Sequence, residues 1–481
     1  MRDLGYHALD VARLAGATYA DIRIIDEVRE RISVKNGAPS IEREETAGFG
    51  VRVIADGAWG FAASPKLTKD EVEKVASLAV RIAKASAKLK KEDVRLAPEP
   101  SYKDKWNSTY IIDPFKVPLE KKLELLMKVD EILRKDARIK VAQGSLLLRR
   151  EHQIFLSSEG SDIEQTILIT GGGYSATAVD EKNNEIQTRS YPGVQGGQYM
   201  QLGWEAIESY DYIGNAERVR DEALALLSAE PCPQGEMDLI ISGEQLALQI
   251  HESLGHPSEL DRVLGMEANY AGTSFLTIDK LGKFRYGSEL VNIVADGTQQ
   301  GGLATVGYDD DGVRSQRWFL VKDGIFVGYL TNRELAHVIG ENRSRGANRA
   351  HGWWSLPMIR MTNISLLPGD WELEDLIADT EKGLFIQTNK SWSIDQKRLN
   401  FQFTTEIGWL IEKGKLTKIV KNPTYQGITP QFWASLDAIC NEKYWVLWGV
   451  PNCGKGQPSQ TAEMSHGAAP ARFRKVRVGL G

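Results

Sequence analysis

Cysteine and histidine are scarce in this sequence, and long apolar runs are absent. Its 481 residues include seven histidines and three cysteines, Cys232, Cys440 and Cys453. Three scattered cysteines cannot build a disulfide framework, so we expect a cytoplasmic protein with reduced thiols. No segment approaches the roughly 18 consecutive apolar residues of a membrane-spanning helix, and no secretion signal follows Met1, so we expect neither a membrane association nor export.

An excess of positive charge is also missing. The chain has 59 Lys and Arg residues against 65 Asp and Glu residues, a formal net charge of −6. Phosphate binding depends on clustered Lys and Arg side chains, so we expect no nucleic-acid partner. The other proportions, 42% hydrophobic and 26% charged residues, are typical of a globular protein, and the length suggests about two to four domains.

Two of the seven histidines stand within one hexapeptide, residues 251–256, whose sequence is His-Glu-Ser-Leu-Gly-His. The apolar residues before it have helical spacing and follow a segment that resembles a buried strand. Ser242 and Gln245 match a capping box, in which the two side chains bond to backbone groups at the start of a helix. We therefore predict that His251 and His256 lie at the far end of a short helix.

The spacing of these histidines differs from the H-E-x-x-H pattern of zinc proteases. At about 100° per residue, four positions bring the second side chain to roughly 40° from the first, whereas five positions leave it roughly 140° away. Either Gly255 and Pro257 end the helix so that His256 lies beyond its last turn, or a π-bulge absorbs the extra residue. Because Pro257 disfavours helical geometry at His256, we prefer the first alternative.

A lone histidine is more often a core or surface residue than a metal ligand, but this segment carries a second signal. Glu252 follows His251 as the general base follows the first histidine of H-E-x-x-H. Catalytic zinc usually takes three protein ligands and leaves one position for water. The candidates for a third ligand are a carboxylate, His337, His351, His466 or a cysteine.

Cys453 leads these candidates without being decisive. It lies in a glycine-rich loop, residues 451–458, where small residues let the backbone approach a buried ion, and Lys455 nearby could favour the thiolate. Cys440 stands in an apolar context that is typical of a small buried side chain.

Four separate segments together resemble the TldD/PmbA metallopeptidases, a family once described as modulators of DNA gyrase. They are residues 48–62, 251–256, 361–364 and 452–458, and the resemblance spans almost the whole chain. It implies a zinc ion held by His251, His256 and Cys453, with Glu252 as the general base. It also implies the TldD branch, because the PmbA (TldE) branch lacks the H-E-x-x-x-H residues.

The resemblance further implies a zinc-dependent peptidase for unfolded or short peptides, with peptide-precursor processing as one use. Such substrates would enter an enclosed site in a dimer, formed with a second copy or with a TldE/PmbA-like chain, and would be held through main-chain bonds. Glu252 would take a proton from a water acidified by zinc and pass it to the leaving amine. His466 is either an oxyanion or substrate contact, or a structural residue.

Two alternatives from other functional classes stay open. The first is a partner or regulatory subunit whose metal site is structural and which gates a catalytic mate. The second is a DNA gyrase-associated regulator, which the negative net charge disfavours.

We predict an α+β fold, a prediction that relies more on the resemblance than on residue patterns. An N-terminal mixed α/β domain, residues 1–230, is followed by a C-terminal domain, residues 231–481, that is rich in antiparallel strands, barrel-like and carries the metal site. Helices are expected at residues 4–15, 72–87, 119–133 and 216–229.

Four shorter patterns complete the prediction. Turn signals at residues 36–37 and 56–57 predict two hairpins. The glycines at 171–173 precede a strand-like segment, which excludes a phosphate loop and predicts close sheet packing. The aspartates at 309–311 lack the later glutamate of an EF-hand loop, which predicts a solvated turn.

Overall fold

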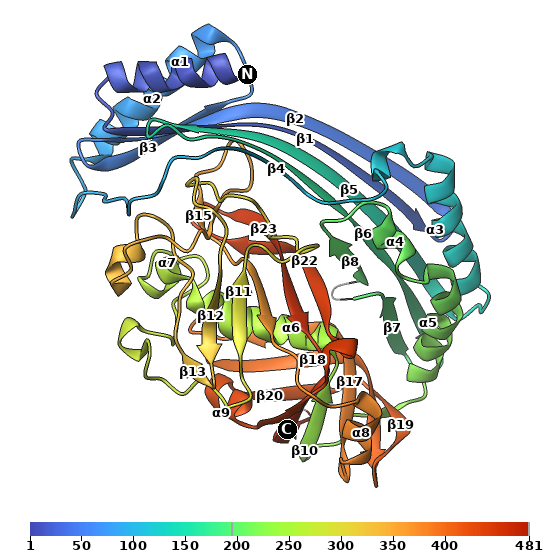
Figure 1. The fold of residues 1–481 in the computed structure, drawn as a ribbon. Helices are drawn as coiled ribbons and strands as arrows, with labels where there is room; N and C mark the ends of the chain where they lie inside the picture. Colours follow the sequence, from blue (N-terminus) through green and yellow to red (C-terminus); the bar gives the residue numbers. More distant parts are fainter. Residues whose placement is uncertain (194–195, 480–481) are drawn as a thin grey trace.

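The fold is α+β, and its first half is organised around one long arched sheet (Figure 1). This computed structural model describes residues 1–193 and 196–479. The strand order in the sheet is β3-β2-β1-β5-β6-β4, with β7 and β8 also paired to β6. The strands are β1 (Tyr19–Lys35), β2 (Ala38–Ala55), β3 (Ala58–Ser64), β4 (Lys103–Asn107), β5 (Ile139–Ser157), β6 (Asp162–Asp180), β7 (Glu185–Tyr191) and β8 (Gln198–Met200).

Both predicted hairpins are present. Lys35 pairs with Ala38 across the first turn, and Ala55 pairs with Ala58 across the second. The first residue of each turn has a positive φ and is followed by glycine, as two-residue hairpin turns require. The alternating segments predicted around residues 20–24 and 29–35 form the single strand β1, because the ladder with β2 continues without a break.

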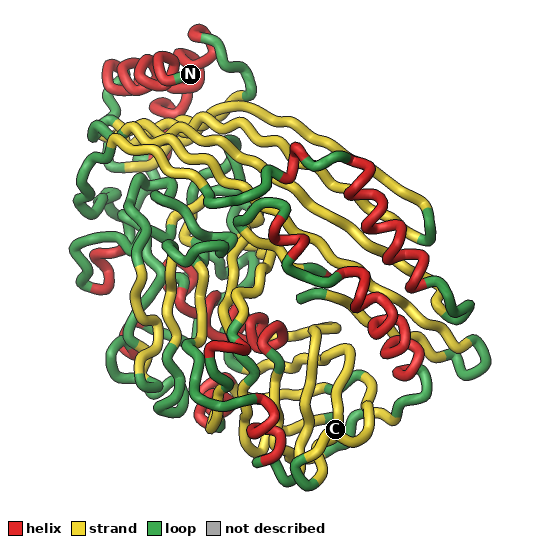
Figure 2. Tube along the Cα trace, turned by 45° about the vertical axis from the view of Figure 1, so that its right-hand side comes forward, coloured by secondary structure: helices red, strands yellow, loops and turns green. Residues whose placement is uncertain are grey.

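Helices cover the outer face of the sheet at its two ends (Figures 1 and 2). α1 (Arg2–Leu14) and α2 (Lys69–Ser86) pack on one end, and α3 (Leu119–Leu133) and α5 (Tyr212–Leu226) on the other, each pair with its own apolar core. The three predicted glycines allow close packing as expected, since a Cβ on Gly171 would lie 2.4 Å from the carbonyl oxygen of Gln198.

The second half contains a closed five-stranded barrel. Its strands follow the order β17-β10-β24-β20-β18, and pairing of β17 with β18 closes the ring. The strands are β10 (Gly235–Ile241), β17 (Lys382–Ile394), β18 (Asn400–Glu412), β20 (Thr424–Ile428) and β24 (Ala471–Val478), with β9 (Glu230–Pro231), β19 (Lys415–Lys421) and β21 (Leu436–Ile439) paired outside the ring. The buried helix α6 (Gly243–Ile250) follows β10 and packs against β17.

Smaller sheets and short helices complete the fold. A four-stranded sheet joins β11 (Ile293–Asp296), β12 (Arg317–Lys322), β13 (Ile325–Phe326) and β16 (Asn363–Leu366), and two ribbons pair β14 (Asn348–Arg349) with β15 (Met358–Ile359) and β22 (Val446–Lys455) with β23 (Gln460–Ala468). The short α-helices are α4 (Glu205–Glu208), α7 (Leu260–Val263), α8 (Leu373–Ala378) and α9 (Thr429–Ala434). Single 3₁₀ turns lie at η1 (Pro114–Lys116), η4 (His256–Ser258), η5 (Ile278–Lys280), η6 (Ala336–Ile339) and η7 (Glu442–Tyr444), and η3 (His251–Gly255) is a π-helix. No helix among the described residues is long and apolar enough to cross a membrane.

The aspartate turn is buried, so the prediction that it is solvated was wrong. Asp311 accepts hydrogen bonds from Arg52 of β2 and from Asn348 at 2.7 and 2.8 Å. Asp310 accepts from Gln153 of β5 at 2.9 Å. The turn lies against the inner face of the arched sheet, a tertiary contact that the local composition does not reveal.

Candidate metal centre

The two histidines of the hexapeptide are brought together by a π-helix. α6 continues into η3 (His251–Gly255), where the backbone N–H of His256 donates to the carbonyl oxygen of His251. A bond across five residues makes one wider turn, so side chains five apart lie on the same side. The preference for a helix that ends at Gly255 was therefore wrong, and the π-bulge alternative is the one that forms.

Side chains from distant segments support this wide turn. The hydroxyl of Ser253 donates to the carbonyl oxygen of Gln249 at 2.5 Å, and the Tyr286 hydroxyl donates to the carbonyl oxygen of Ser253 at 3.0 Å. A Cβ on Gly255 would lie only 2.2 Å from the sulfur of Met361. The bulge is thus fixed by hydrogen bonds at one residue and by close packing at another.

The capping box predicted at the start of α6 does not form. Ser242 is the N-cap residue, as expected, but its hydroxyl makes no capping hydrogen bond. The Gln245 side chain instead donates to the hydroxyl of Tyr425 in β20 at 3.0 Å. The contact with the barrel therefore uses the Gln245 side chain that the capping box would have required.

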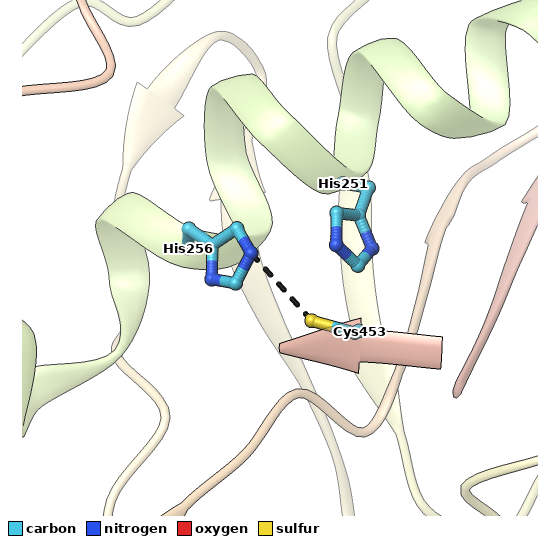
Figure 3. A group of neighbouring side chains, drawn as sticks. All are labelled: His251, His256 and Cys453. Carbon is cyan, nitrogen blue, oxygen red and sulfur yellow. Dashed lines mark hydrogen bonds between the residues drawn. The ribbon is translucent and has the colours of Figure 1, made fainter. Parts of the chain in front are cut away.

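The structure brings His251, His256 and Cys453 into one buried group (Figure 3). The potential ligand atoms all lie within 4.8 Å of one another, and the Cys453 Sγ is 3.6 Å from the His256 Nε2. Zinc bonds of about 2.0 Å to nitrogen and 2.3 Å to sulfur in a tetrahedron place such atoms roughly 3.5 Å apart. Two imidazoles and a thiolate form a donor set that suits zinc, so these residues fit a metal by chemistry and spacing.

Each imidazole is held by a partner behind it. His466 Nδ1 lies 3.0 Å from the carbonyl oxygen of Ile364, which can only accept, so His466 Nε2 is the acceptor for His251 Nδ1–H at 2.7 Å. His256 Nδ1 lies 2.9 Å from a carboxylate oxygen of Glu259. Both rings therefore present an unprotonated Nε2 to the shared space, the orientation that a metal ligand needs.

The local charges favour a thiolate at Cys453. Burial by itself would raise its pKa, but the two imidazoles and Arg360 hold the pKa well below its usual value. Arg360 also donates to the Cys453 carbonyl oxygen at 2.6 Å. Lys455, which the sequence suggested for this role, instead forms ion pairs with Asp261 and Glu259.

Glu252 lies beside the donor group and is paired with a residue that the sequence did not reveal. Its carboxylate accepts a hydrogen bond of 2.5 Å from Arg398 in the turn between β17 and β18. The side chains of Glu252 and Arg398 are 7% and 13% exposed. No local pattern marks Arg398, and Glu259 was visible only as an acidic residue three positions after His256.

The other candidates for a third ligand lie elsewhere. His337 is exposed, and His351 is hydrogen-bonded to the Thr461 hydroxyl at 2.9 Å. Cys440 is buried, and burial raises its pKa to about 12, as expected of an unreactive thiol. His466 contacts His251 but is outside the group of three.

Three family models match the chain. One described as the PmbA/TldA metallopeptidase C-terminal domain covers residues 234–479, and those for domain 1 and the central domain cover residues 20–83 and 112–227. This chain belongs to the PmbA/TldD metallopeptidase family.

Relatives within the family cover nearly the whole chain. A metalloprotease of Methanocaldococcus jannaschii is 32% identical over 91% of this chain and 92% of its own length. A zinc metalloprotease TldD homolog of Saccharolobus solfataricus is 23% identical over 96% of this chain and 97% of its own. The crystal structure of TldE from Thermococcus kodakarensis has the same fold, with a TM-score of 0.74 at 18% identity over 99% of this chain and 100% of that one.

Proposed function

We propose that this chain is a zinc-dependent peptidase of the TldD type. His251, His256 and Cys453 would hold the zinc, and Glu252 would act as the general base. The observation that carries the proposal is the convergence of three metal-binding atoms from two distant segments with a carboxylate beside them. When bound, zinc supplies a Lewis acid that polarises a carbonyl group and acidifies a water molecule.

Each protein group has a part in this chemistry that follows from its contacts. Glu252 Oε2 is engaged by Arg398, whereas Oε1 has no hydrogen-bond partner among the described residues and is free to accept the proton of an attacking water. The same carboxyl group would then pass that proton to the leaving amine. His466 and Glu259 would hold the rings of His251 and His256 in their ligand orientation.

We further propose that unfolded or short peptides are the substrates and that the active species is a dimer. A buried centre suits substrates that can enter as extended chain rather than as folded protein. The family resemblance supports a second chain, and the shared fold with a TldE supports a TldE-like mate, although a second copy of this chain is the other possibility. A cytoplasmic location is part of the same proposal.

A partner subunit with a structural metal site is the alternative that the geometry also favours. All three donor residues are at most 5% exposed, and Glu252 is occupied by Arg398. Burial of the donors and of Glu252 suits a structural role, whereas a catalytic site keeps one coordination position accessible to water. Turnover separates the two functions.

The decisive experiment substitutes Glu252→Gln in zinc-loaded protein and measures zinc content and cleavage of an unstructured peptide. We expect zinc at the wild-type level and a loss of cleavage of about 100-fold or more, because an amide cannot accept the proton. Glu44→Gln, at an exposed position in β2, is the matched control. Cleavage at the wild-type rate by Glu252→Gln would show that this carboxylate is not the base.

A further inference from the structure

The residue paired with Glu252 is the most informative feature of the centre that the proposed chemistry leaves unused. Arg398 sits at φ +64 in the turn between β17 and β18. Its guanidinium is largely buried and donates to the carboxylate of Glu252, the residue next to His251. It is thus a cation beside the place where the reaction would occur.

The backbone around Arg398 is held firmly. The Thr429 hydroxyl donates to the Arg398 carbonyl oxygen at 2.9 Å, and the N–H of Phe275 donates to the Lys397 carbonyl oxygen at 2.9 Å. Asp395 accepts from the N–H of Leu399 at 2.8 Å. A turn fixed at three points presents the guanidinium in a defined position, as electrostatic preorganisation requires.

The Arg398 guanidinium does not use all of its hydrogen-bond donors within the described residues. Its Nη1 binds Glu252, but its Nε is buried and has no hydrogen-bond partner within residues 1–193 and 196–479. A buried donor without an acceptor is costly to keep, and an arginine in a folded protein normally uses its planar set of N–H groups. An unpaired donor beside a reactive centre points to an acceptor that arrives with the substrate.

The chemistry of peptide hydrolysis identifies that acceptor. The attack of water on a peptide converts its neutral carbonyl oxygen into an oxyanion, and donors fixed in advance around that oxygen lower the barrier. Because Glu252 must face the attacking water, a group bonded to Glu252 is a near neighbour of the carbon under attack. A thiolate ligand also reduces the positive charge of the centre, and Arg398 would restore it.

We propose that Arg398 is a second catalytic residue, whose guanidinium orients Glu252 and donates a hydrogen bond to the scissile carbonyl oxygen as that oxygen becomes negative. This inference rests on the proposed peptidase function. No bond is made or broken at Arg398, and its proton stays on the guanidinium throughout.

The test compares Arg398→Met with Lys397→Met, which removes an exposed cation from the same turn. Zinc content, kcat, KM and the Kd of a phosphinic peptide, an anionic mimic of the tetrahedral adduct, are measured on each. We expect Arg398→Met to keep its zinc, to lose about 100- to 1,000-fold in kcat with KM within threefold, and to bind the phosphinic peptide at least 30-fold more weakly. Lys397→Met should match the wild type.

The outcomes separate this inference from the proposed function. If Arg398→Met keeps kcat and phosphinic-peptide affinity within threefold of Lys397→Met while Glu252→Gln is inactive, the peptidase stands and the role of Arg398 is refuted. Loss of zinc, or a rise in KM alone, would show a merely structural role and refute it equally. A wild-type chain that neither cleaves peptides nor binds the phosphinic peptide would overturn both proposals. Should Arg398→Met not fold, Arg398→Lys, which keeps the charge without the planar donors, is expected to lose at least tenfold in the same two quantities.

Discussion

Replacing His466 by leucine should weaken zinc binding without removing a ligand. The His466 side chain is fully buried, accepts from His251 Nδ1–H and donates to the Ile364 carbonyl oxygen. Leucine fills a similar volume but offers neither group. His251 would keep a buried N–H with no acceptor, and nothing would hold its ring in the orientation that aims Nε2 at the other donors.

The size of the effect follows from this geometry. Loss of the partner behind a metal-bound histidine typically lowers metal affinity about 10- to 100-fold, or roughly 1.4 to 2.7 kcal/mol. We expect the upper half of this range, because the 2.7 Å contact is fully buried and bulk water cannot replace the acceptor. The Kd for zinc is measured by competition with a chromophoric chelator at constant pH.

Two further variants make the measurement specific. His466→Gln restores an acceptor for His251 and should recover most of the affinity. His337→Leu removes an exposed histidine and should leave the Kd unchanged. A folded His466→Leu that binds zinc as tightly as His337→Leu would refute the argument that the contact orients His251.

Three other predictions test separate parts of the structure. Cys453→Ser should lower the zinc content of the purified protein severalfold, whereas Cys440→Ser should not; equal zinc in both would rule out the thiol of residue 453 as a ligand. Gly255→Ala should lower Tm by several degrees and weaken zinc binding, because its new methyl group would overlap the sulfur of Met361. A variant with the Tm of the wild type would mean that the π-helix tolerates a side chain at this position. Burial raises the pKa of Glu151 from 4.5 to about 7. Between these two pH values the folded chain binds more protons than the unfolded chain, so the free energy of unfolding falls as the pH rises from 4.5 to about 7. Glu151→Gln cannot lose stability in this way, so the Tm of the variant relative to the wild type should rise between about pH 5 and pH 7.5. A Tm difference that does not change with pH would contradict the raised pKa of Glu151.

The parts of the fold that depend on local chemistry were predictable from the sequence. Asn36-Gly37 and Asp56-Gly57 supply the positive φ angles of two-residue turns, so both hairpins were placed correctly. The α+β class and the barrel-like second half were also predicted, largely through the family resemblance. The proposed division near residue 230 stays a prediction.

The parts that depend on tertiary contacts were not predictable. Pro257 argued that the helix would end, yet Tyr286 and Met361, from outside the helix, hold the wider turn. The aspartates at 309–311 have the composition of a solvated loop, but Asp311 forms an ion pair with Arg52 under the arched sheet. Arg398 lies 146 positions from Glu252, and no periodicity or motif connects residues at that separation.

The arched sheet contributes to the candidate metal centre even though it supplies none of the three donors. Cys453 is carried by the β22–β23 ribbon, and Arg149 of β5 forms an ion pair with Glu463 on that ribbon. The side-chain amide of Gln198 in β8 donates to the carbonyl oxygen of Leu447 and accepts from the N–H of Gly449, both in β22. The position of the Cys453 sulfur depends on the position of the ribbon, because a site is precise only when the elements that carry it are rigid. The two halves of the chain therefore form one structural unit, in which side chains of the first half help to hold the strand that carries Cys453.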